Sequence, residues 1–74
     1  MSPTEIIAAV AAERNMFPGE LTGAGGARGV VQAREEAARR IAAVHGHPTA
    51  DRALQRPVGW SERVAGKLKL EDGK

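Results

Sequence analysis

Between Arg28 and His45 one series of apolar residues recurs at intervals of three or four positions. Its members are Val30, Ala33, Ala37, Ile41 and Val44. This spacing is typical of one face of an amphipathic α-helix, and no stretch of the chain shows the alternation of a half-buried strand. We therefore predict a helix over 28–45 with this stripe facing the core and Arg34 at its border. Its outward charges include two pairs at the favourable i,i+4 spacing, Glu35–Arg39 and Glu36–Arg40.

The start of the chain predicts a first helix over 3–15. Ser2-Pro3-Thr4-Glu5 fits a capping box, with serine before the helix, proline at its first position and glutamate at its third. Ile6 and Val10 then follow at helical spacing and are expected to face the core. Pro18 to Leu21 allow at most one helical turn, which we expect Phe17 and Leu21 to hold against the core.

The last third of the chain predicts two further helices, over 50–56 and 61–69. Thr49 is expected to cap the first of them and Ser61 the second, while Pro57-Val58-Gly59 separates the two. A short helix, a tight turn and a second helix are the layout of a helix-turn-helix. We therefore predict an all-α fold, a small helical bundle with a helix-turn-helix, as a single domain over 1–70 followed by a tail, 71–74.

Composition narrows the possible functions. The 74 residues contain no cysteine, which excludes disulfides and thiolate metal sites, and one Phe and one Trp leave little for base stacking. Residues 1–26 carry one basic and three acidic residues, a net charge of −2, whereas residues 27–74 carry ten basic and six acidic residues, a net charge of +4. The basic half is either a surface for a polyanion or a solvated face. No segment resembles a leader or a membrane span, so we expect a cytoplasmic protein.

The glycine-rich stretch 23–28 does not predict a nucleotide site. Arg28 occupies the sixth position of the dinucleotide fingerprint, no strand precedes the stretch, and no Gly-Lys-Ser/Thr is present. Two interpretations of the stretch remain, and both can hold at once. It is a flexible linker, or it leads loosely into the start of a helix where Arg28 and free backbone amides contact phosphate. His45 and His47 lack a third ligand at suitable spacing, and Ser61 and Glu62 lack a nucleophile–base arrangement. We expect no metal, no cofactor and no enzymatic activity.

The helix-turn-helix predicts double-stranded DNA as the partner. The last helix would enter the major groove with Ser61, Glu62, Arg63 and Lys67 at the bases. Phosphates would be contacted by Arg28, Arg34 and Lys69. The alternative is a small helical domain that binds another protein and no DNA.

The order of features along the chain points to one family. The first helix contains Val10-Ala11, Leu21-Thr22-Gly23 follows, and the long helix opens with Arg28, Val30, Arg34 and Ala37. Over residues 6–70 this order resembles the C-terminal DNA-binding domain of the bacterial replication initiator DnaA. The resemblance implies an all-helical fold similar to that of the Trp repressor and sequence-specific binding of duplex DNA. It also implies that Arg28 enters the minor groove and that Arg34 lies near the DNA backbone.

The chain departs from that family in the residues that read DNA. The family's Arg-Asp-His-Ser/Thr run falls on Gly59-Trp60-Ser61-Glu62, where its first three residues are not retained. We therefore expect a DNA preference other than the initiator's box. Because Met1 stands close to the first helix and no ATPase region accompanies the domain, we expect the N-terminal domain of a transcriptional regulator, such as an activator of phage or gene-transfer-agent operons. Other transcription proteins are then further expected partners.

Overall fold

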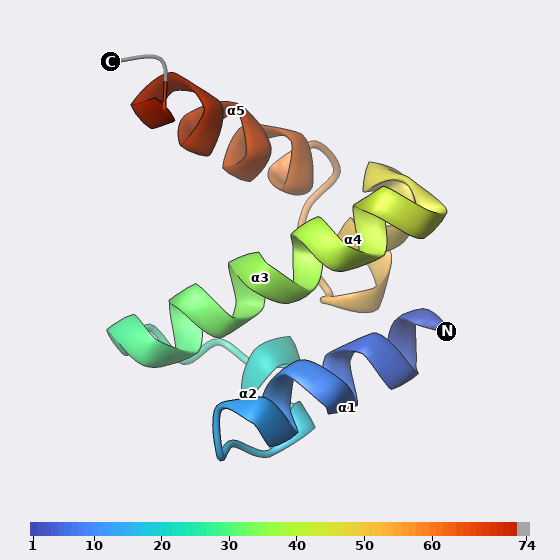
Figure 1. The fold of residues 1–74 in the computed structure, drawn as a ribbon, viewed down its shortest axis with the longest axis vertical. Coiled ribbons are helices and arrows are strands. Elements are labelled where there is room, and N and C mark those ends of the chain that lie inside the picture. The colour runs from blue at the N-terminus through green and yellow to red at the C-terminus, as the bar shows by residue number, and fades with distance from the viewer. Residues whose placement is uncertain (73–74) are drawn as a thin grey trace.

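The chain folds into five helices and, over residues 1–72, no strand. A computed structural model describes the backbone of residues 1–72 and the side chains of residues 1–66. The helices are α1 (Pro3–Glu13), α2 (Pro18–Thr22), α3 (Arg28–His45), α4 (His47–Ala53) and α5 (Trp60–Asp72) (Figure 1). The predictions of an all-α fold and of a helix over 28–45 are confirmed.

The long helix α3 is the centre of the fold. It lies between α1 and α5 in Figure 1 and packs against each of the other four helices. Alanines supply much of the buried surface and allow the helix axes to approach closely, which suits a chain with few large apolar residues. The core consists of Ile6, Ile7, Val10, Ala11, Leu21, Ala33, Ala37, Ala38, Ile41, Ala50 and Leu54.

Two residues predicted to face the core do not. Phe17 is 78% exposed and Val44 is 66% exposed. Phe17 lies directly before α2, where its backbone N–H donates to the Glu20 carboxylate at 2.8 Å, and the core beside it is filled by Leu21 and Met16. Val44 lies in the last turn of α3, whereas Ala38, outside the predicted stripe, is buried because α3 is covered on more than one side.

The ends of α1 and α4 come earlier than predicted, and both ends have the same cause. Asn15 and Gln55 adopt the left-handed conformation, with φ of 61° and 55°. At each of them the amide of the left-handed residue and the amide of the following residue bond back to the last turn, as in a Schellman motif: Met16 donates to Ala11 at 2.8 Å and Arg56 donates to Asp51 at 2.8 Å. A left-handed residue cannot continue a right-handed helix, so the chain turns at these two positions.

Gln55 is the more strained of the two left-handed residues, because asparagine tolerates this conformation better than glutamine does. Gln55 is exposed and its side chain makes no hydrogen bond to a described residue. We expect Gln55→Gly to raise the free energy of unfolding by about 1 kcal/mol, measured by urea denaturation. The matched control, Asn15→Gly, should gain less, and equal gains at both positions would contradict this account.

The boundaries of the last two helices also differ from the prediction. α4 begins at His47, after Gly46 with φ of 93° and ψ of 160°, so Thr49 lies within the helix and does not cap it. Glycine is favoured at that backbone conformation because a Cβ would be strained there. α5 begins at Trp60 and continues to Asp72, into the segment predicted as a tail.

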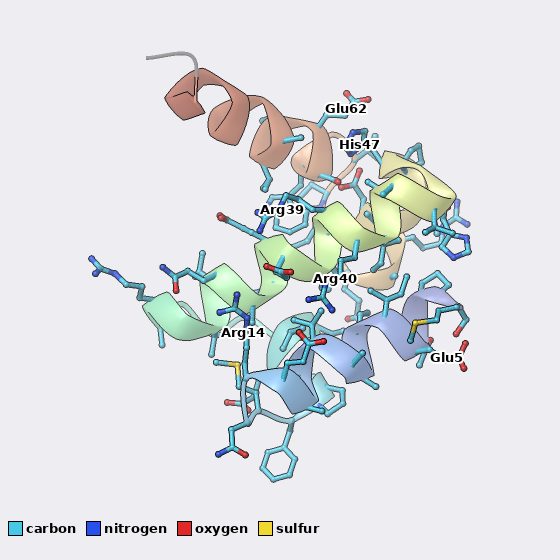
Figure 2. All side chains as sticks on the ribbon, in the orientation of Figure 1. Glu5, Arg14, Arg39, Arg40, His47 and Glu62 are labelled. Carbon is cyan, nitrogen blue, oxygen red and sulfur yellow. The ribbon has the colours of Figure 1, made fainter. Side chains whose placement is uncertain are left out.

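An ion-pair network joins α1 to α3 on the face toward the viewer in Figure 2. Arg40 donates to Glu13 at 2.8 Å and pairs with Glu36 at 2.9 Å, and Glu36 also accepts from Arg39 at 3.2 Å and Arg14 at 3.5 Å. The predicted Glu36–Arg40 pair is therefore present, while Arg39 pairs with Glu36 and not with Glu35. The hydrogen bond from Arg40 lowers the pKa of Glu13 and, with the bond to Glu36, raises the pKa of Arg40.

Candidate nucleic-acid interface

The candidate interface is the α4–α5 unit, made of α4, the turn 54–59 and α5, and Asp51 holds this unit together. Asp51 lies on α4 and is 4% exposed. One of its carboxylate oxygens accepts from the Gly59 N–H at 2.9 Å and the other from the Ser61 N–H at 2.7 Å. These amides belong to the start of α5, which has no intrahelical partners for them. Asp51 therefore caps α5 from the preceding helix and neutralises the positive end of its dipole.

Ser61 is part of the same joint and is not available to bases. Its side chain is 2% exposed, and its hydroxyl lies 2.7 Å from Nδ1 of His47 on α4. The prediction that Ser61 caps the last helix and contacts DNA is therefore wrong on both points. The reason is that α5 begins one residue earlier, which turns Ser61 toward α4 while Asp51 supplies the cap.

The outer face of α5, defined here as Glu62, Arg63 and Gly66, is exposed. The opposite face, with Ser61 and Val64, is buried. Figure 2 shows Glu62 pointing away from α3 on the outer side of the helix. Glu62 and Arg63 thus lie where the sequence predicted them to be accessible. The side chains of the other two predicted residues of this helix, Lys67 and Lys69, lie outside the described residues.

Arg34 was predicted to contact the DNA backbone, and the structure corrects this. Its side chain is buried, with 6% exposure, and donates to the backbone carbonyls of Leu21 at 2.8 Å, Gly25 at 2.9 Å, Gly23 at 3.1 Å and Glu20 at 3.3 Å. These carbonyls belong to the end of α2 and to the glycine-rich connection 23–27. Because Nε and Nη2 already donate to these carbonyls, the guanidinium does not offer a phosphate the pair of free N–H groups that bidentate binding requires.

A second arginine reaches the same connection from the turn of the α4–α5 unit. Arg56 donates through Nη2 to the Gly23 carbonyl, which Arg34 also contacts, and through Nε to the Leu54 carbonyl at 3.1 Å. Burial, together with the neighbouring charge of Arg56, lowers the pKa of Arg34. Two guanidinium groups therefore hold the glycine-rich connection against both α3 and the turn. The prediction of a loose linker does not describe the connection at Gly23 and Gly25.

Arg28, the first residue of α3, is exposed. The residue before it, Ala27, provides no side-chain cap, and no described side chain accepts a hydrogen bond from the first amides of α3. Because α3 and α5 run in roughly opposite directions, the start of α3 and the end of α5 both lie on the left side of Figure 1. Arg28 is therefore separate from Glu62 and Arg63, which lie near the start of α5.

Sequence reasoning missed three residues of this region: Asp51, Arg56 and Arg52. Arg52 is exposed on α4 and, like Arg28 and Arg63, makes no hydrogen bond or ion pair with another described residue. The only signal for Asp51 was its place on a short helix eight residues before a glycine that precedes the next helix. Whether residues that far apart in the sequence contact each other depends on the direction of the turn between them, and residue spacing does not encode that direction.

The histidines have structural partners. His47 lies against Ser61, and Nε2 of His45 lies 2.8 Å from the Met1 carbonyl oxygen. Among the described residues, no three His, Cys, Asp or Glu side chains are grouped so as to hold a metal ion. Within the same part of the chain, no helix has the length and apolar character needed to cross a membrane.

Comparisons with known protein families, with curated proteins and with solved structures found no match to this chain.

Proposed function

We propose that the chain binds double-stranded DNA, with the α4–α5 unit acting as a helix-turn-helix and α5 entering the major groove. The observation that carries this proposal is the outer face of α5. Glu62 and Arg63 are exposed next to each other at the start of a helix whose opposite side is buried and whose N-terminus is fixed by Asp51. Arginine reads guanine through two hydrogen bonds, and glutamate accepts a hydrogen bond from cytosine.

Phosphate contacts are assigned to exposed arginines that have no partner among the described residues. Arg28 stands at an uncapped helix start, where amide groups favour an anion, and Arg52 lies on α4 beside the turn. Lys67 and Lys69 follow Arg63 in the same helix and add to the positive charge of this half of the chain. Arg34 is not part of the proposal, because its hydrogen bonds are used within the fold.

The resemblance to the DNA-binding domain of the initiator DnaA supports the same proposal, with a different DNA preference. A role in transcription, in the cytoplasm, follows as part of the proposal, and under it the chain is a binding module and not an enzyme. The changed residues at 59–61 support a different target, since Gly59 lacks a side chain and Ser61 is buried.

The test is a fluorescence-anisotropy titration of the protein with random duplex DNA at low and at physiological salt. We expect binding that weakens with salt, with a log–log slope of about −0.9 per neutralised phosphate. Arg63→Ala should cost about 1–3 kcal/mol on preferred sequences, because it removes a base contact. Arg28→Ala should weaken binding to all sequences equally, because it removes a phosphate contact.

Arg39→Ala is the matched control, since Arg39 is ion-paired with Glu36 on the face that joins α1 to α3. It should leave DNA binding unchanged. Absence of binding at low salt would overturn the proposal and favour the alternative, a helical domain that binds another protein. Chemical-shift mapping with duplex DNA tests the face directly, because the largest changes are expected at residues 62, 63 and 66.

A further inference from the structure

Gly66 is an exposed glycine in the middle of α5, and the fold does not explain its presence. A Cβ added at this position would meet no described atom within 4 Å outside the backbone of the helix itself. Glycine destabilises a helix interior relative to alanine, because it loses more conformational freedom on folding. Any other helix-forming residue would therefore improve the stability of α5.

The other two glycines within the described helices have local explanations. A Cβ at Gly29 would stand 3.4 Å from the Met16 methyl carbon, so a side chain there meets the core at the edge of ordinary contact. Gly19 lies in the first turn of α2, a helix of five residues, in which helix propensity has little influence. Gly66 differs from both, since it lies in the interior of a 13-residue helix and no described side chain stands near it.

The neighbours of Gly66 on the helix surface are charged. Residues three and four positions apart lie side by side on a helix, so Gly66 adjoins both Arg63 and Glu62 on the outer face of α5. The outer face therefore has a gap in its side-chain layer directly beside an exposed arginine with no partner among the described residues. The surrounding half of the chain carries a net charge of +4, from ten basic and six acidic residues, which is complementary to a polyanion.

We propose that Gly66 is the point of closest approach between α5 and duplex DNA. The missing side chain lets the wall of the groove reach the helix backbone, and this depth brings Arg63 within reach of base edges. A side chain at this position would hold α5 away from the groove. The inference rests on the proposed function. It adds that glycine at this position makes α5 less stable than alanine would but allows the helix to lie closer to DNA.

The test compares Gly66→Ala and Gly66→Gln with the wild type in two measurements, thermal unfolding and anisotropy with random duplex DNA. Both substitutions should raise the midpoint of unfolding, by about 4 °C for alanine, because they remove a glycine from a helix interior. Gly66→Gln should nevertheless weaken DNA binding about tenfold, since its side chain occupies the contact. Gly66→Ala should have a smaller effect on binding. A fold more stable than the wild type that binds DNA less well cannot result from a structural defect.

Gly19→Gln is the matched control, because Gly19 is also exposed with open space around it and lies on α2, on the far side of α3 from α5 (Figure 1). It should leave DNA binding unchanged. If Gly66→Gln binds as tightly as the wild type, the inference is wrong while the proposed function stands. A lower unfolding midpoint for both Gly66 variants would show that the fold requires this glycine and would overturn the inference. If the wild type itself binds no DNA, the inference and the proposed function fail together.

Discussion

Replacing Arg34 by methionine is expected to lower the free energy of unfolding by about 3 kcal/mol, since it removes a charged donor from several buried or partly buried carbonyl groups. Methionine keeps the length and apolar volume of the side chain, so the loss reports on the hydrogen bonds to Leu21, Glu20, Gly23 and Gly25. Total stability for a domain of this size is about 4–11 kcal/mol, so the change should be large. Urea denaturation followed by circular dichroism measures it.

Arg39→Met is the matched control for Arg34→Met, because it removes an arginine from the same helix. Arg39 is exposed and makes a single ion pair, with Glu36, so its loss should cost about 0.5 kcal/mol or less. Arg34→Lys should recover only part of the stability, since an ammonium group lacks the planar fork that reaches several carbonyls. Similar losses for Arg34→Met and Arg39→Met would mean that water satisfies the carbonyls as well as Arg34 does.

Replacing Asp51 by alanine is the second change with a large expected effect. It leaves the Gly59 and Ser61 amides without an acceptor, and the Ser61 side chain is buried, so water has poor access there. We expect a loss of about 2–3 kcal/mol in the free energy of unfolding. Hydrogen exchange of the amides at 59–63 should accelerate more than that of α1, because the cap acts on α5 locally.

Glu62→Ala is the control for Asp51→Ala, because Glu62 is an acidic residue in the first turn of α5. Unlike Asp51, it is exposed and accepts no hydrogen bond from a described residue. It should cost about 0.5 kcal/mol, through the helix dipole alone. Asp51→Asn should lie between the two, since its amide has one oxygen acceptor where the carboxylate has two. Equal effects of Asp51→Ala and Glu62→Ala would contradict the role of Asp51 as the cap of α5.

The buried arginine changes the interpretation of the glycine-rich connection. Its carbonyls at Gly23 and Gly25 accept hydrogen bonds from Arg34, and Arg56 adds a bond to Gly23 from the turn of the α4–α5 unit. The connection thereby links α2, α3 and this turn. Loss of Arg34 should therefore affect the placement of both Arg28 and the turn, even though Arg34 itself is not available to DNA.

Local sequence patterns predicted the long helix and the start of the first helix. The apolar spacing of 28–45 predicted α3, and Ser2-Pro3-Thr4-Glu5 predicted the start of α1, where Glu5 accepts from the Ser2 amide at 2.8 Å and the Ser2 hydroxyl accepts from the Glu5 amide at 3.2 Å. The exposed positions of Glu62 and Arg63 were also predictable. These features depend on residues within about four positions of one another, a range that helical periodicity covers.

Only the tertiary structure decided which polar residues belong to the fold and which are left for a partner. Arg34 and Arg28 look alike in the sequence, yet one is buried against carbonyls nine to fourteen residues away and the other is exposed. Asp51, Ser61 and His47 are likewise joined across a turn, over spacings of ten and fourteen residues. Such contacts depend on how the helices pack and on the direction of the turns between them. Whether a polar side chain is hydrogen-bonded within the fold is therefore decided by residues far away in the sequence.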